Sequence, residues 1–262
     1  MNTKRFNGTF SYKKDVGKVR ISNEDNAKVL VDSAGNVLMM VADGMGGANK
    51  GDYASLEVIN GMSEAFKNRK RFYCLFDCVH FLKKTYKLFE YATSKNLKII
   101  NKRIYNLSFT NNNYKGMGST IIIAFIYKDE LIVANVGDSR CYSLSKKEFK
   151  QLSEDETYAY YLYNSGQISK EEIKTHPKRH VLINAIGIYP SLSVDIKIFK
   201  YNKESILLCS DGLYNNVNEP DIENILRTDD STEVKVNSLI NVANFNGGSD
   251  NISVALWECL DD

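Results

Sequence analysis

Three aspartates stand beside apolar runs that lie far apart in the sequence. Two of these runs lead into an Asp-Gly pair, and the third run follows its aspartate. The aspartates are Asp43, Asp211 and Asp250, and the runs are Val37–Ala42, Ile206–Cys209 and Ile252–Trp257. A strand end holds a side chain in a fixed direction, and a neighbouring glycine lets the backbone turn sharply. We therefore expect the strands to bring the three carboxylates to one shared site.

The remaining chain has the pattern of hairpins interleaved with helices. Strand-like runs at 28–31 and 36–42, and again at 119–127 and 131–136, are separated by short turns. Apolar residues recur at helical spacing over 50–66 and again along a second stretch that begins near Phe72. Short turns join antiparallel strands, whereas parallel strands need long crossovers. The sequence thus predicts an α+β fold of antiparallel sheets covered by helices.

Three local segments carry further expectations. The polar, basic start, Met1–Lys14, predicts a solvated and partly ordered segment. Apolar and charged residues alternate from Val194 to Ile198, which predicts a half-buried strand with Ile206–Cys209 as its partner. The polar stretch Ser153–Arg179 has too few apolar residues for a core of its own, so we expect a surface flap at about residues 153–180.

Composition narrows the class of protein. The chain has 262 residues with 43% apolar residues and no linker or repeat, so residues 1–262 are predicted to form a single domain. A net charge of only +2 gives no electrostatic case for binding nucleic acid or a membrane. The five cysteines show no zinc-type spacing, and no apolar run approaches the ~20 residues of a membrane span. The start lacks the apolar stretch of a signal peptide, so a cytoplasmic protein is expected.

The aspartates point to hard divalent cations, because carboxylate oxygens select magnesium or manganese over zinc. Two such ions ~3.5–4 Å apart can share a bridging carboxylate and activate water for attack on phosphorus. We assign the bridge to Asp43, with the Gly44 carbonyl on the second ion. Asp211 and Asp250 complete the shell of one ion, and Glu24 serves the other, partly through water. Arg20 precedes Glu24 and is the candidate to grip phosphate.

Other interpretations of these residues are weaker. Each Asp-Gly pair alone is ordinary turn chemistry, and only the set of three favours a metal site. A phosphate-binding loop fails because Asp52-Tyr53 stands where Lys and Ser or Thr are required. The histidines His80, His176 and His180 show no metal-ligand spacing, and no nucleophile-elbow sequence supports a serine triad.

Seven motifs together resemble one family. They are Arg20–Asp25, Val41–Gly47, Gly116–Thr120, Ala134–Arg140, His176–Arg179 with Ala185–Gly187, Cys209–Leu213 and Gly248–Ile252. In this order they resemble the metal-dependent serine/threonine protein phosphatases of type 2C, in particular the bacterial branch. The resemblance runs from about Val16 to the end of the chain.

The resemblance implies a four-layer α-β-β-α sandwich with a metal cleft at one edge of the two sheets. It implies that Asp43, the Gly44 carbonyl, Asp211 and Asp250 bind two Mn²⁺ or Mg²⁺ ions, with Glu24 nearby. Arg20 matches the family's phosphate-binding arginine. Asp138 matches the aspartate that, with Asp211, holds a weaker third ion. The stretch at about 153–180 matches the family's mobile flap.

Some positions depart from the family's pattern. Animal members carry a histidine after the Asp-Gly pair, proposed as the general acid, where this chain and bacterial members have Met45. For bacterial members the implied proton donor is a metal-bound water. Glu156 and Thr157 replace a His-Ser pair, and Asn184 replaces an arginine found in many relatives. These changes affect the flap and leave the expected metal ligands in place.

The sequence therefore predicts an enzyme that hydrolyses phosphoserine and phosphothreonine on proteins. Its expected partners are phosphorylated protein substrates and an opposing Ser/Thr kinase, with no nucleic acid, no membrane and a monomeric state. One alternative is a non-catalytic regulator of the same fold that binds phosphoproteins. Another is a metal-dependent hydrolase of small phosphate esters.

Overall fold

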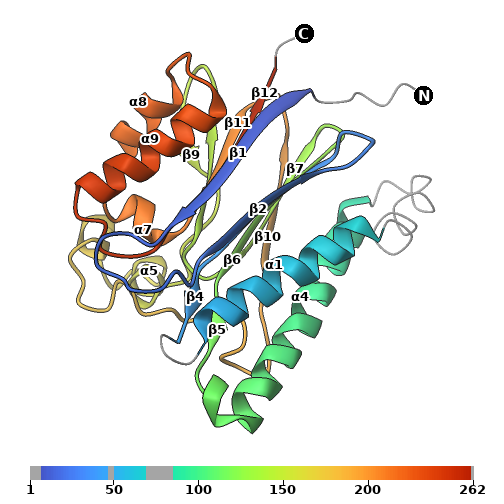
Figure 1. Cartoon of the computed structure of the whole chain (residues 1–262), viewed down its shortest axis with the longest axis vertical. Helices are drawn as coiled ribbons and strands as arrows, with labels where there is room; N and C mark the ends of the chain where they lie inside the picture. Colours follow the sequence, from blue (N-terminus) through green and yellow to red (C-terminus); the bar gives the residue numbers. More distant parts are fainter. Residues whose placement is uncertain (1–6, 47–49, 69–84, 261–262) are drawn as a thin grey trace.

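Two five-stranded antiparallel sheets pack face to face, and helices cover the outer face of each (Figure 1). The computed structural model describes residues 7–46, 50–68 and 85–260. A third sheet has only two strands, β4 (Gly44–Met45) and β5 (Gly118–Ser119). The layers are thus helix, sheet, sheet and helix.

Each large sheet is assembled from strands that are distant in sequence. The first has the order β1 (Gly8–Asp15), β12 (Ile252–Cys259), β11 (Ser205–Cys209), β8 (Arg140–Leu144) and β9 (Phe149–Gln151). The second has the order β10 (Asp195–Lys200), β7 (Glu130–Val136), β6 (Ile121–Tyr127), β3 (Val37–Ala42) and β2 (Asn26–Val31). Every neighbouring pair is antiparallel.

The helices divide between the two outer faces. On the second sheet lie α1 (Gly51–Lys67) and α4 (Thr85–Thr110), and on the first lie α7 (Asp211–Tyr214), α8 (Glu219–Leu226) and α9 (Thr232–Phe245). Smaller elements are η2 (Asn112–Tyr114), α5 (Tyr158–Asn164) and α6 (Lys170–Ile173). In the described part of the chain, no helix combines the length and apolar character that crossing a membrane requires.

Three apolar cores hold the layers together, one between each adjacent pair. Strand β6 contributes side chains to two of these cores, one on each face of its sheet. Ile121, Ile123 and Phe125 pack in the core under α1 and α4, whereas Ile122, Ala124 and Ile126 face the other sheet. Because successive side chains of a strand alternate between faces, a strand buried on both sides must be apolar throughout. This accounts for the uninterrupted apolar runs in the sequence.

The predicted α+β fold of two antiparallel sheets flanked by helices is confirmed. Both predicted hairpins form, as β2–β3 and β6–β7, and α1 covers the first predicted helix. Asn218 and Ser231 cap α8 and α9 by accepting backbone hydrogen bonds from Asp221 and Val234. Much of the second predicted helical stripe, from Phe72 to Leu82, lies outside the described residues.

The predicted start is solvated as expected but more ordered than predicted, because residues 8–15 form a strand whose side chains are exposed or half-buried. Strand β1 pairs with β12 along its whole length, from Gly8 opposite Cys259 to Asp15 opposite Ile252. Its side chains are polar because β1 is an edge strand whose outer face meets solvent, with Phe10 stacked on Trp257. Because the partner of β1 lies at the far end of the chain, the composition of residues 8–15 alone does not reveal the strand.

The predicted pairing of residues 194–198 with 206–209 is wrong. Strand β10 pairs with β7, and β11 lies in the other sheet between β12 and β8. The short link between β10 and β11 crosses from one sheet to the other, where the Trp257 Nε1–H donates a hydrogen bond of 3.0 Å to the Tyr201 hydroxyl. A short link between strands is typical of a hairpin, and here it instead joins two layers.

We predict that Trp257→Ala lowers the free energy of unfolding by about 3–5 kcal/mol, because it opens a cavity in the core between the sheets. Trp257 is 1% exposed. Phe245, which is 91% exposed, gives the control, and Phe245→Ala should cost about 0.5 kcal/mol or less. Urea unfolding of both variants measures the difference. Equal losses in the two variants would contradict the placement of Trp257 in this core.

Candidate active site

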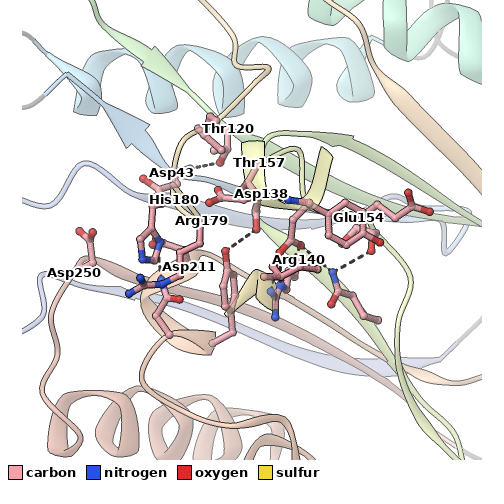
Figure 2. A pocket seen from close by; sticks show the side chains of 18 of the residues that line it. Asp43, Thr120, Asp138, Arg140, Glu154, Thr157, Arg179, His180, Asp211 and Asp250 are labelled. Atoms are coloured by element: carbon pink, nitrogen blue, oxygen red, sulfur yellow. Dashed lines mark hydrogen bonds and ion pairs between the residues drawn. The ribbon is translucent and has the colours of Figure 1, made fainter. Parts of the chain in front are cut away.

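Asp43 directly follows β3 and is held by hydrogen bonds on both sides of its peptide unit. Its N–H donates to Thr120 Oγ1 at 3.0 Å, and the Thr120 N–H donates to the Asp43 carbonyl at 2.8 Å. The Ser119 hydroxyl also donates to that carbonyl, at 3.1 Å. These contacts fix the backbone of Asp43, whose side chain Figure 2 shows among the other acidic groups of the pocket.

Close backbone packing brings Glu24 and Gly44 beside Asp43. A Cβ on Gly44 would lie 2.3 Å from the Gly51 carbonyl oxygen and 2.5 Å from that of Glu24, so no side chain fits there. A Cβ on Gly51 would lie 2.9 Å from the carboxyl carbon of Glu24, which places that carboxylate against the start of α1. Glycine at both positions is therefore a condition for this approach.

Asn251 ties the segment that carries Glu24 to Asp250. Its Oδ1 accepts from the Glu24 N–H at 2.8 Å, and its Nδ2 donates to the carbonyls of Val16 at 3.0 Å and Ser22 at 2.9 Å. Its own N–H donates to Asp250 Oδ1 at 2.8 Å. Asn251 is 5% exposed, so these bonds form away from water. In the sequence, Asn251 stands out only as a member of the motif Gly248–Ile252.

Arg20 lies in the same cluster and forms an ion pair with Asp250. The distance from Nη2 of Arg20 to Oδ2 of Asp250 is 2.8 Å. This contact is the first cause of a raised pKa at Arg20, to which Asp43 and Glu24 also contribute. The Arg20 side chain remains 53% exposed, so it is partly open to solvent.

Asp138 is fixed by an aromatic and ionic platform that sequence reasoning missed. Arg140 binds both oxygens of Asp155, with the shortest contact at 2.7 Å, and its guanidinium lies 3.6 Å from the centre of the Tyr214 ring. The Tyr214 hydroxyl donates to the Asp138 carbonyl at 3.1 Å. Asp155 begins the predicted flap, so the platform joins the flap to Asp138.

Burial and mutual repulsion raise the pKa values of the clustered carboxyls. For Asp43 the first cause is burial, followed by the charges of Asp25, Asp211, Asp138 and Asp250. Burial and then Asp211 raise the pKa of Asp138, and burial and then Asp250 raise the pKa of Asp211 to about 6. Confined like charges disfavour the ionised form, and a nearby cation would restore it.

Asp25 belongs to this cluster, although the sequence assigned it no role. It is 0% exposed, and its Oδ2 accepts a hydrogen bond of 2.7 Å from the Ser210 hydroxyl. Its burial raises its pKa to about 7. Within the described residues, Oδ1 of Asp25 and Oδ1 of Asp211 are buried without a hydrogen-bond partner. An unpaired buried carboxylate oxygen is a position where a cation or water would be stabilised.

The donor set thus fits hard divalent cations by its chemistry. The predicted ligands Glu24, Asp43, Gly44, Asp138, Asp211 and Asp250 all line one cleft, together with Arg20. Across residues 7–46, 50–68 and 85–260, however, no three acidic, histidine or cysteine side chains converge at metal-binding geometry. Asp250 is turned toward Arg20, and Oδ2 of Asp211 accepts from Asn215 at 3.0 Å. The ligand assignment therefore stays a prediction.

The cleft extends well beyond the acidic cluster, to a volume of about 1820 Å³. The stretch predicted to form a flap contributes α5 and α6, and it supplies part of the lining through Tyr160, Lys170, Lys174, Arg179 and His180. The acidic floor and this wall face the same space. Whether the wall moves, as a flap would, stays a prediction.

Comparison with known proteins agrees with this arrangement. A family model described as protein phosphatase 2C matches residues 18–242. This chain belongs to the protein phosphatase 2C family. The family predicted from the motifs is therefore confirmed, and with it the class of enzyme, a protein phosphatase.

Individual members are similar over nearly their full length. The serine/threonine phosphatase stp of Listeria welshimeri is 34% identical over 248 residues, 94% of each chain. The crystal structure of serine/threonine phosphatase Stp1 from Staphylococcus aureus has a TM-score of 0.87 at 27% identity and covers 100% of this chain and 98% of its own. The catalytic domain of the phosphatase PstP, solved with two manganese ions, shares the fold with a TM-score of 0.78 at 24% identity, covering 97% of this chain and 99% of that one.

We predict that Asn251→Ala lowers the free energy of unfolding by about 3 kcal/mol, because buried backbone groups of Val16, Ser22 and Glu24 lose their partner. Asn113→Ala, at an exposed position of η2, is the matched control and should change stability by about 0.5 kcal/mol or less. Chemical denaturation of both variants measures the effect. A loss below about 1 kcal/mol for Asn251→Ala would contradict its role as a clamp.

Proposed function

We propose that this protein hydrolyses phosphoserine and phosphothreonine on protein substrates, using two divalent cations held by the acidic cluster. One observation carries the proposal. Carboxylates from separate strand ends and loops line a single cleft with Arg20, and several of them are buried together at raised pKa. Burying several carboxylates together is unfavourable unless a cation neutralises them. Such clusters with raised pKa values are typical of functional sites.

The ligand roles follow from the position of each residue. Asp43 is best placed to bridge the two ions, because its backbone is fixed and its carboxylate interacts with those of Asp211 and Asp250. The Gly44 carbonyl and Glu24 would complete one shell, and Asp211 and Asp250 the other. Asp138, which interacts with Asp211, would hold a weaker third ion. When bound, the two ions would activate a water for attack on phosphorus and neutralise charge on the phosphoryl group.

Arg20 would bind the phosphoryl group. Its guanidinium is exposed on the cleft side, and one of its nitrogens is anchored by Asp250. The remaining N–H donors can form two parallel hydrogen bonds to phosphate oxygens, which orients phosphorus over the acidic cluster. The ion pair with Asp250 thus positions Arg20 beside the ligands it serves.

The size of the cleft favours protein substrates over small phosphate esters. Pockets for small molecules usually enclose roughly 300–1,000 Å³, whereas this cleft measures about 1820 Å³ and is lined by residues of several elements. A non-catalytic regulator would need no intact acidic set, whereas here Arg20 and every predicted acidic ligand are present in the sequence and line the cleft. An opposing Ser/Thr kinase, a cytoplasmic location and a monomeric state remain expectations from the sequence.

We predict that Asp43→Asn reduces manganese-dependent hydrolysis of a phosphothreonine peptide by at least about a hundredfold, the scale seen when a central electrostatic group is lost. Asp52→Asn, an exposed aspartate of α1 near Asp43 in sequence, should retain full activity. Steady-state assays with manganese, magnesium or chelator provide the measurement, and manganese is tested first because the PstP catalytic domain was solved with it.

Full activity of Asp43→Asn in manganese would reject the proposed metal site. Hydrolysis of a small phosphate ester with no hydrolysis of the peptide would instead favour the alternative enzyme. No hydrolysis of either substrate by the unmodified protein would favour the non-catalytic regulator.

A further inference from the structure

The proposed reaction needs a proton donor for the leaving oxygen. Cleaving a phosphoserine or phosphothreonine ester releases an alkoxide, which is a strong base. A positioned general acid typically accelerates such steps by roughly 10²–10⁴-fold. Met45 stands where animal relatives carry the histidine proposed for this task, and a thioether has no proton to give.

His180 lies in the same cleft as the acidic cluster. It lines the cleft together with Asp43, Asp211 and Asp250, and all four are labelled in Figure 2. Among the residues that the structure describes, its imidazole forms no hydrogen bond or ion pair. Both ring nitrogens are therefore available to a substrate.

The backbone next to His180 is anchored to the start of the flap. The Tyr158 N–H donates to the Val181 carbonyl at 2.8 Å, and the Ile183 N–H donates to the Glu156 carbonyl at 2.9 Å. Thr157 and Leu182 form a β-bridge between these two bonds. His180 is thus the last residue before a short ladder, so its Cα has a defined position at the rim of the cleft.

Glu156 joins that ladder to the turn that carries Asp138. Its Oε2 accepts from the Gly137 N–H at 2.8 Å, and its N–H donates to the Gly137 carbonyl at 2.9 Å. Asn184 donates to the same Oε2 at 2.8 Å. Glu156, which replaces the histidine of other members, and Asn184, which replaces their arginine, are therefore bonded to each other. Together they fix the segment of His180 relative to the acidic floor.

The neighbouring histidine of the flap lacks these properties. The ring of His176 lies 6.0 Å from that of Tyr158, and its Nδ1 accepts a hydrogen bond of 3.1 Å from the Lys178 N–H. It is not among the residues that line the cleft. His176 therefore serves as a matched control, since it has the same side chain on the same segment.

We propose that His180 is the general acid that protonates the leaving oxygen, an inference that rests on the proposed function. A hydroxide oxygen bonds to phosphorus while the bond from phosphorus to the seryl or threonyl oxygen breaks. The electron pair of that bond stays on the departing oxygen, and the imidazolium proton moves to it. The products are hydrogen phosphate, a free hydroxyl group and a neutral imidazole, which solvent protonates again.

The surroundings of His180 suit this role. Partial burial and the positive charge of Arg179 lower its pKa, while Asp250 opposes them. A lower pKa makes the imidazolium a stronger acid toward an alkoxide. The incoming phosphate carries negative charge, which favours the protonated imidazole when substrate is bound.

The experiment compares substrates that differ in their need for a proton. The p-nitrophenolate ion is a weak base and leaves unaided, whereas a threonine alkoxide does not. With manganese present, His180→Gln should lower kcat on a phosphothreonine peptide by about a hundredfold and kcat on p-nitrophenyl phosphate by less than about threefold. His176→Gln should leave both values within about threefold of the unmodified protein. Because His180 is exposed, its replacement should leave the melting temperature unchanged.

Each other outcome overturns the proposal. Unchanged kcat on the peptide would assign the proton to another donor, such as bound water. Equal losses on both substrates would place His180 in phosphate binding or in folding, and the melting temperature separates these two. If the unmodified protein hydrolyses neither substrate with manganese, the proposed function itself fails. If it hydrolyses both and His180→Gln behaves like His176→Gln, only the role of His180 fails.

Discussion

Repulsion between carboxylates in one cleft is the constraint on which the rest of the structure depends. Asp25, Asp43, Asp138 and Asp211 are held close enough together that burial and mutual charge raise their pKa values. Without other contacts to hold them, the carboxylates would move apart into solvent, where their charges repel less. They stay because hydrogen bonds hold them in place: Thr120 accepts from the backbone N–H of Asp43, and the Asn251 N–H donates to the carboxylate of Asp250. Two arginines, Arg20 and Arg140, offset part of the charge, and the proposed cations would offset more.

The packing of the sheets sets the spacing of this cluster. Asp43 follows β3 of one sheet, whereas Asp211 follows β11 and Asp250 precedes β12 of the other. The apolar core between the sheets, with Trp257 and Ile122 among its members, therefore determines how far apart the carboxylates lie. In this way a non-directional hydrophobic contact positions the polar chemistry. The flap is joined to the same frame through Glu156 and through Arg140 with Asp155.

Features encoded by neighbouring residues could be predicted from the sequence. The hairpins β2–β3 and β6–β7, the caps Asn218 and Ser231, and the aspartates beside strands all have local signals. Contacts between segments that are distant in sequence had no local signal, so they could not be predicted. Strand β1 needs β12, β10 pairs in the opposite sheet from β11, and the clamp by Asn251 exists only once residues 16–24 meet the far end of the chain. The burial of Asp25 and the availability of His180 likewise depend on tertiary structure.

The central claim is that the acidic cluster holds a pair of divalent ions bridged by Asp43. Anomalous diffraction from crystals grown with Mn²⁺ tests it most directly. Two manganese peaks ~3.5–4 Å apart are expected, with Asp43 between them and Asp211 and Asp250 beside one of the two. Data of good quality with no manganese peak within reach of Asp43 would contradict it.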